Sequence, residues 1–220
     1  MPAASRLERE VLAWSFFVAS IAAFFVAYLT GHDTLRLLLK PLPAWSLAAW
    51  VATRRSGLAR PVLAGLLIGS LGDLFLETGN PSHFVPGLLA FLFGHLAYIF
   101  GFAREAPALA PLRALPFLGM VSLVMAITLP KAGPLAVPIG AYGVVIAVMM
   151  WRAAARVGGP AGALAWAGLL GATSFAFSDS MIAVNRFVQP FDGARPLILV
   201  TYWGAQALVA LSVPREQVAR

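Results

Sequence analysis

Two aspartates, Asp73 and Asp179, stand inside long apolar stretches and are the best candidates for catalysis in this sequence. An Asp near the centre of a membrane helix costs about 2.5–3.5 kcal/mol, so such a residue marks a functional site by default. Glu77 follows Asp73 by four residues and therefore shares its helix face. A protonated carboxyl beside an ionised one can supply a general acid and a general base. We therefore expect the two aspartates to form a catalytic pair.

Other polar residues are expected close to these aspartates. At about 1.5 Å per residue, both aspartates lie about 6–10 Å below the outer ends of their helices. Lys40 and Tyr202 come at a similar level, and His95 and Gln206 lie deeper. The sequence thus predicts a polar cluster that is drawn from five helices and leans toward the outer side.

Each of these residues also has a purely structural interpretation. Asp73 could serve only as the ion-pair partner of Lys40, and Asp179 could cap local backbone or pair with Arg186. His95, Tyr202 and Gln206 could instead form hydrogen bonds between membrane helices. Lys40 could extend its ammonium toward the outer lipid headgroups. Glu77 lies where the helix reaches the interface, and there it could simply be solvated.

The residue types that are absent exclude several kinds of catalytic chemistry. Cysteine is absent, which removes disulfides and thiolate catalysis. The three histidines form no i, i+4 pair and no Glu-x-x-His arrangement, so we expect no metal and no cofactor. The net charge of +7 is distributed over the ends of apolar segments, where basic residues orient membrane proteins. It therefore predicts no nucleic-acid partner.

The composition is that of an integral membrane protein. Hydrophobic residues make up 60% of the chain and charged residues 11%, and the mean hydropathy is +0.83. We predict an all-α, polytopic helical bundle that forms one transmembrane domain over residues 1–220 and is embedded in a lipid bilayer. The eight predicted spans are 11–30, 34–53, 60–78, 83–103, 113–129, 134–152, 161–186 and 194–213.

The basic residues predict the orientation of this bundle. With the N-terminus inside, the cytoplasmic segments hold 11 of the 16 Lys and Arg residues and the outer segments hold five. Both termini should therefore be cytoplasmic. The excess of Arg over Lys, with abundant Ala, Gly and Pro, is typical of a GC-rich bacterial genome, so we expect a multi-pass protein of the inner membrane. Similar spacing of polar residues in spans 3–4 and 7–8 indicates either a parallel four-plus-four repeat or chance similarity.

Five short motifs, met in order along the chain, resemble those of the YhhN proteins and their animal relatives, the lysoplasmalogenases. They are K-P-L-P at 40–43, G-S-L-G-D at 69–73, F-x-x-G-H-x-x-Y at 91–98, S-D-S at 178–180 with Asn185 and Phe187, and T-Y-W at 201–203 with Gln206. The resemblance covers essentially all eight predicted spans.

This resemblance implies a hydrolase that acts on ether bonds of a membrane lysophospholipid. Family members cleave the sn-1 vinyl-ether bond of lysoplasmalogen to a fatty aldehyde and glycerophosphoethanolamine or glycerophosphocholine. We carry catalysis over to Asp73 and Asp179 only. Substrate binding is expected of the other polar residues, namely Lys40, Glu77, His95, Asn185, Tyr202 and Gln206.

Hydrolysis of a vinyl ether starts with protonation at carbon, and water then captures the resulting oxocarbenium ion. Burial keeps one carboxyl protonated as the acid, while the second carboxylate stabilises the cation and activates water. We assign Asp73 as the acid because its sequence neighbours are apolar, and Asp179 as the base because serines flank it. The reverse assignment is the alternative.

Three other functions fit the same residues. Intramembrane carboxylates also line the pathways of transporters and channels, although these aspartates lie toward one side of the membrane. A metal-dependent lipid hydrolase and a lipid-binding protein without turnover are the other two alternatives.

Overall fold

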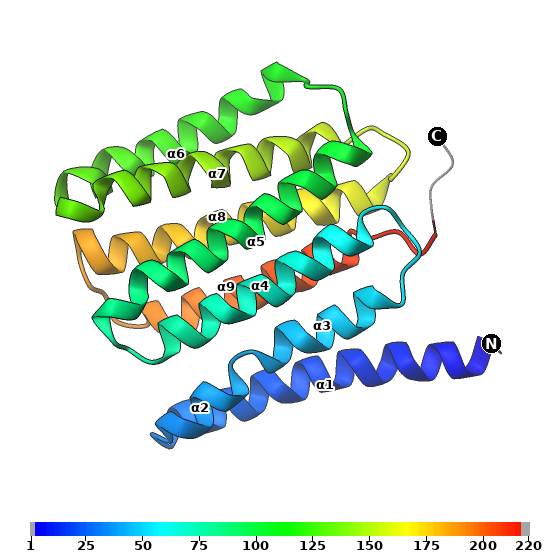
Figure 1. Cartoon of the computed structure of the whole chain (residues 1–220), viewed down its shortest axis with the longest axis horizontal. Coiled ribbons are helices and arrows are strands. Elements are labelled where there is room, and N and C mark those ends of the chain that lie inside the picture. Colours follow the sequence, from blue (N-terminus) through cyan, green and yellow to red (C-terminus); the bar gives the residue numbers. More distant parts are fainter. Residues whose placement is uncertain (1–2, 217–220) are drawn as a thin grey trace.

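The computed structural model describes residues 3–216 of the chain, and the side chains from residue 7 onward. These residues fold into α-helices joined by short turns, with no β-strand among them (Figure 1). The helices are α1 (Ala3–Leu29), α2 (Asp33–Leu39), α3 (Leu42–Ala52), α4 (Ala59–Glu77), α5 (Phe84–Glu105), α6 (Leu115–Thr128), α7 (Ala136–Ala155), α8 (Ala163–Ala183) and α9 (Ala194–Leu211). Helices suit a bilayer because each one satisfies its own backbone hydrogen bonds. The predicted all-α class is confirmed.

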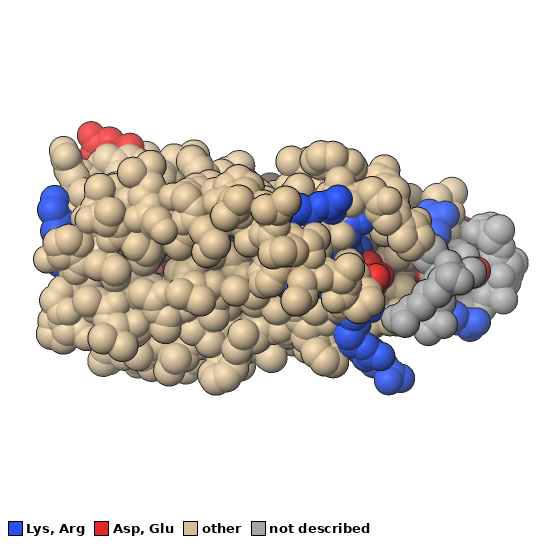
Figure 2. Space-filling model, turned by 90° about the horizontal axis from the view of Figure 1, so that it is seen from above, with Lys and Arg blue, Asp and Glu red and all other residues tan. Residues whose placement is uncertain are grey.

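Seven helical segments within the described residues are long and apolar enough to cross a membrane, which indicates a multi-pass membrane protein. They are Leu7–Leu29, Ala59–Glu77, Pro81–Glu105, Pro111–Lys131, Gly133–Ala155, Ala163–Val188 and Ala194–Leu211. Most of the visible face is uncharged, and basic and acidic side chains gather toward its ends (Figure 2). Seven of the eight predicted spans therefore correspond to observed helices.

The prediction of one continuous helix over residues 34–53 is wrong. The chain forms α2 and α3 instead, with a break at Lys40 and Pro41. Pro41 and Pro43 have no N–H to donate, so the ladder of helical hydrogen bonds stops and restarts there. The two halves together run back along α1 in Figure 1. Residues 33–52 extend about 30 Å at 1.5 Å per residue, so an eighth crossing by a broken helix stays a prediction.

Contacts at one end of the bundle show that α2 and α3 return the chain to where α1 began. Glu10 in the first turns of α1 pairs with Arg54 beyond α3 at 3.5 Å and with Arg215 beyond α9 at 3.1 Å. The backbone N–H of Arg55 also donates to the carbonyl of Arg215. The start of α1 and the end of α9 thus meet at the same end (Figure 1), as an even number of passes requires. Arg220 and the side chain of Arg6, which enter the predicted charge count, lie outside the described residues.

Small residues allow the closest helix packing, which occurs between α4 and α5 and between α8 and α9. A Cβ on Gly94 of α5 would lie 3.0 Å from the carbonyl oxygen of Gly65 and 3.5 Å from the N of Gly69, both on α4. The Gly65-x-x-x-Gly69 stripe therefore receives a neighbouring helix, as small-residue faces do in membranes. In the second pair, a Cβ on Gly171 would lie 2.9 Å from the backbone N of Val209.

We expect Gly171→Ala to destabilise the protein by about 1–3 kcal/mol, because the added methyl meets the backbone of α9, which cannot rotate away. Gly204→Ala in α9 is the matched control, since no atom lies within 4 Å of its added Cβ. Thermal unfolding in detergent measures both variants. Equal melting temperatures for the two would show that α8 and α9 are not tightly packed at Gly171.

Candidate active site

A polar cavity of about 460 Å³ opens at the end of the bundle opposite to the two termini, where α4 ends and α9 begins. The end of α8 and the start of α5 also border it. Its charged lining residues are Lys40, Asp73, Glu77, Asp179, Arg186 and Arg195, and Asn185 and Tyr202 are among its polar ones. Six of the eight predicted site residues thus line one cavity, and His95 and Gln206 lie outside it.

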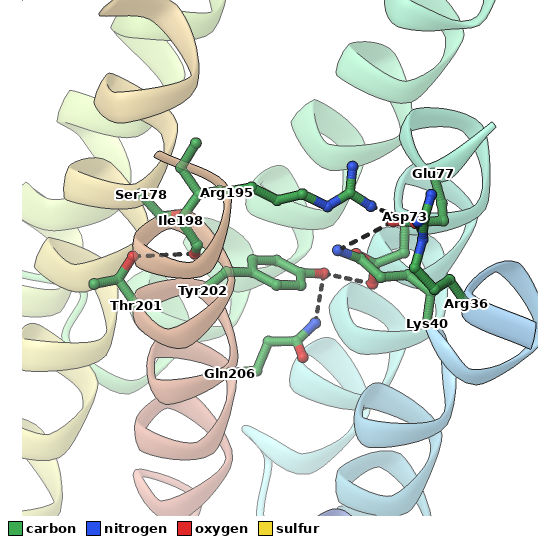
Figure 3. Close-up of polar contacts among 10 residues, drawn as sticks. All are labelled: Arg36, Lys40, Asp73, Glu77, Ser178, Arg195, Ile198, Thr201, Tyr202 and Gln206. Atoms are coloured by element: carbon green, nitrogen blue, oxygen red, sulfur yellow. Dashed lines mark hydrogen bonds and ion pairs between the residues drawn. The ribbon is translucent and has the colours of Figure 1, made fainter. Parts of the chain in front are cut away.

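Asp73 is buried in a network that spans three helices. The Tyr202 hydroxyl donates to Asp73 Oδ2 at 2.7 Å, and the Gln206 amide donates to the Tyr202 hydroxyl oxygen at 2.7 Å. Lys40 Nζ lies 3.9 Å from Asp73 Oδ1. Figure 3 shows Tyr202 reaching from α9 across to Asp73 on α4. The ion pair of Asp73 with Lys40, on which the structural alternative rests, is therefore present, and both a cation and a hydroxyl donor face this carboxylate.

Glu77 is the most heavily paired acid of the cavity. Arg36 Nε lies 3.1 Å from its Oε1, Lys40 Nζ lies 3.8 Å from its Oε2, and Arg195 Nη2 also bonds Oε1 (Figure 3). The side chain of Glu77 is only 2% exposed. The alternative that Glu77 is solvated is therefore wrong, because α2 folds over the end of α4 and brings Arg36 with it.

Lys40 owes its position to the helix break. It caps the C-terminal end of α2, directly before Pro41, and its ammonium lies between the carboxylates of Asp73 and Glu77. The rings of Phe24 and Trp203 lie 5.2 and 5.3 Å from Nζ, which adds cation–π attraction. Lys40 is therefore a buried counter-ion held among rings and two acids.

Asp179 has different surroundings from Asp73. The Tyr142 hydroxyl on α7 donates to Asp179 Oδ2 at 2.8 Å. No ion pair reaches Asp179 from the described residues, so the alternative that Asp179 pairs with Arg186 is wrong. The adjacent serines donate to the carbonyls of Ile198 and Ala176. They do so because successive residues of a helix point in different directions.

A second, apolar pocket of about 70 Å³ meets the polar cavity at Asp179. Met120 and Met125 of α6 and Ile139 and Ile146 of α7 line its far side. The two spaces share the lining residues Leu76, Phe84, Phe91, Asp179 and Ile182. Asp179 thus stands at the junction of a polar and an apolar compartment.

His95 lies behind the network rather than in the cavity. It is 1% exposed, and neither ring nitrogen has a hydrogen-bond partner among the described residues. The rings of Phe175 and Tyr142 lie 5.1 and 5.6 Å from its centroid. Gln206 Oε1 likewise lacks a partner, and both residues line a space of about 10 Å³. The interhelical hydrogen bond considered for His95 is not formed with any described residue.

Four residues at the site were not predicted from the sequence as site residues. Arg186 and Arg195 line the polar cavity, Tyr142 lines the apolar pocket, and Arg36 bonds Glu77. Tyr142 carries a hydroxyl within a long apolar run, and the hydroxyl of a buried Tyr usually forms a hydrogen bond. Its polar contact could therefore have been predicted from the sequence. The three arginines stand at segment ends, where they are indistinguishable from residues that only orient the protein.

No group of three or more His, Cys, Asp or Glu able to hold a metal occurs in the part of the chain that the structure describes.

Comparison with known proteins identifies relatives of this chain. Residues 35–213 match the model of the YhhN family. The human lysoplasmalogenase TMEM86B is 34% identical over 96% of this chain and 91% of its own length. The human lysoplasmalogenase TMEM86A is 32% identical over 89% of this chain and 86% of its own length. A lysoplasmalogenase of Mycobacterium bovis is 32% identical over 82% and 71%. No solved structure matches.

Proposed function

Since this chain belongs to the YhhN family, we propose that it is a lysoplasmalogenase-like hydrolase of the bacterial inner membrane. It cleaves the sn-1 vinyl-ether bond of a lysoplasmalogen to a fatty aldehyde and a glycerophospho-base. The observation that carries the proposal is that Asp73 of α4 and Asp179 of α8 line one cavity. Two carboxylates in one cavity, in different surroundings, are the arrangement that acid/base hydrolysis requires.

The two compartments fit the two parts of such a lipid. The alkenyl chain enters the apolar pocket between α5, α6, α7 and α8, and the glycerophospho part occupies the polar cavity. α6 contacts mainly α7, and most of its surface is exposed, so the chain enters from the surrounding lipid. The reactive bond then lies at the junction, beside Asp179.

The contacts favour the reverse of the acid/base assignment expected from sequence neighbours. Lys40 and the Tyr202 hydroxyl both favour the ionised form of Asp73, whereas Asp179 faces a hydroxyl and the apolar pocket. The chain-side carbon of the vinyl ether is the one that is protonated, and it lies nearest the apolar pocket. We therefore assign Asp179 as the acid and Asp73 as the base.

The proposed reaction then proceeds in three steps. Asp179 gives its proton to the chain-side carbon, and the electron pair of the double bond forms the new C–H bond. The resulting oxocarbenium ion is stabilised by the Asp73 carboxylate, which also takes a proton from the attacking water. In the hemiacetal that forms, the bond from carbon to the glycerol oxygen breaks as that oxygen takes the proton held by Asp73. The hemiacetal hydroxyl gives its proton to Asp179, so the fatty aldehyde remains and both carboxyl groups return to their starting states.

Topology supports access from the outer side. We propose eight crossings, with α2 and α3 as one broken crossing and with both termini cytoplasmic. Arg54, Arg55, Arg152, Arg156 and Arg215 gather at the end where the termini meet. The polar cavity then opens toward the outer leaflet.

Product analysis tests the function. Purified protein is incubated with an alkenyl lysophospholipid in deuterium oxide, and the products are identified by mass spectrometry. We expect a fatty aldehyde with solvent deuterium on the carbon next to its carbonyl, because that carbon takes the proton. The saturated alkyl-ether analogue should survive, since it has no double bond to protonate. If reconstituted protein forms no aldehyde from this substrate, the proposal is refuted. Flux of a solute across the membrane of proteoliposomes would support a transporter instead.

A further inference from the structure

The turn that follows α8 presents polar side chains to the cavity in an unusual way. Residues Val184–Val188 form η5, a π-helical turn closed by Gln189 N–H donating to the carbonyl of Val184 at 2.9 Å. Such wide turns occur mostly as single turns and frequently at functional sites. Here the turn places both Asn185 and Arg186 on the lining of the polar cavity.

Arg186 differs from the other cavity cations in its pairing. Lys40 pairs with Asp73 and Glu77, and Arg195 bonds Glu77. Arg186 forms no ion pair with any residue in the range 7–216, and its guanidinium stacks on the Phe84 ring at 3.9 Å. Stacking fixes the plane of the guanidinium and leaves its N–H donors open to an anion.

A second cation and a neutral donor line the same cavity. Arg195 Nε is buried without a hydrogen-bond partner among the described residues, although its Nη2 bonds Glu77. Asn185 Oδ1 accepts from the Phe191 backbone N–H at 3.2 Å. That bond leaves the two amide N–H donors of Asn185 for a ligand.

We propose that Arg186 binds the phosphate of the lysophospholipid headgroup, with Asn185 and Arg195 as supporting donors. This inference rests on the proposed function, because it concerns the same cavity. A planar guanidinium can hold two phosphate oxygens through two parallel N–H donors, a fixed geometry that an ammonium lacks. Lys40, one of the predicted substrate-binding residues, lies between two acids and balances their charge.

The spacing agrees with a single bound lysolipid. Asp179 and Arg186 are seven residues apart, which corresponds to about 10 Å along a helix. The glycerol backbone separates the sn-1 oxygen from the phosphate, and the flexible Arg side chain spans the remaining distance. The phosphate thus lies at the outer rim of the cavity while the vinyl ether lies beside Asp179.

Binding of ligands that cannot be cleaved tests this inference apart from catalysis. A saturated alkyl-ether lysophospholipid and an alkylglycerol with the same chain are titrated against protein in lipid nanodiscs, with tryptophan fluorescence as the readout. We expect the wild type to bind the lysophospholipid more tightly. Arg186→Ala should weaken that binding about 10–100-fold and leave alkylglycerol binding unchanged. Arg186→Lys should retain part of the preference.

Arg104→Ala is the matched control. Arg104 is also an exposed Arg, and its guanidinium lies 5.4 Å from the centroid of the Phe100 ring. It lies near the C-terminal end of α5, whereas Arg186 stacks on Phe84 at the N-terminal end of that helix. It should bind both ligands as the wild type does. Equal affinity of the wild type for both ligands, or an equal loss of both in Arg186→Ala, would overturn the inference.

Kinetics separates this inference from the proposed function. If aldehyde forms, Arg186→Ala should raise KM for the alkenyl lysophospholipid by the same factor, with kcat within about twofold. A phosphate preference that depends on Arg186, found in a protein that forms no aldehyde, would support the phosphate site and refute the hydrolase. Aldehyde formation with an unchanged KM in Arg186→Ala would support the hydrolase and refute the phosphate site.

Discussion

Replacing Asp179 with Asn lowers kcat for the alkenyl lysophospholipid by about 10²–10⁴-fold, the range that a general acid contributes. The amide keeps the size of the side chain and can still accept from Tyr142, but it has no carboxyl proton to give to carbon. KM should change little, because the chain pocket and the polar cavity are preserved. Aldehyde release, followed by mass spectrometry, measures the effect.

Ser180→Ala serves as the matched control for this variant. Ser180 follows Asp179 directly and lines the same apolar pocket, but its hydroxyl donates only to the Ala176 carbonyl. It should keep at least about half of the wild-type kcat. Asp73→Asn should lose activity over the same range as Asp179→Asn, because the cation would then lack its carboxylate. Full turnover in either Asn variant would remove the two-carboxylate mechanism.

The helices were predictable because the bilayer imposes a simple rule on the sequence. A spanning segment must be apolar for about 20 residues and must satisfy its own backbone, so hydropathy alone located α4 through α9 to within a few residues. α1 begins at Ala3 rather than near residue 11, because a helix can continue through polar residues beyond the apolar run. The break between α2 and α3 escaped this rule because both halves are apolar and hydropathy is blind to missing backbone donors.

The sequence identifies most residues of the site, but it does not show which of them contact each other. Asp73 and Tyr202 stood out because each is a polar residue in an apolar helix, and the structure joins them by a hydrogen bond. Tyr142, by contrast, could not be assigned to Asp179 from the sequence, because that contact depends on how α7 packs against α8. Helix periodicity gives the face of a residue within its own helix and leaves open which helix that face meets.

The roles of the cations depend on packing to an even greater degree. A basic residue at the end of a span can orient the protein, pair with an acid or bind a ligand, and its position in the sequence is the same in each case. Arg36 and Arg195 both reach Glu77, from helices that are far apart in the chain. Glu77 therefore faces three cations and neutralises part of their charge. Among the described residues, Asp73 forms an ion pair only with Lys40, which it shares with Glu77.

Replacing Glu77 with Gln should lower the free energy of unfolding by about 3 kcal/mol, near the lower end of what breaking a buried ion pair costs. The loss is large because Glu77 is 2% exposed and faces Arg36, Lys40 and Arg195, which the amide would leave without a counter-charge. It stays near the lower end because Arg195 is 41% exposed and is therefore partly hydrated. Reversible unfolding in mixed detergent micelles measures the change.

Asp33→Asn provides the matched control, because Asp33 pairs with the same Arg36 at 2.8 Å but is 82% exposed. An exposed pair of this kind contributes at most about 1 kcal/mol, so this variant should unfold nearly as the wild type does. The difference between the two variants isolates the effect of burial, since both remove one carboxylate from Arg36. Equal destabilisation by the two substitutions would mean that the end of α4 is open to water and that Glu77 does not anchor α2 and α9 to it.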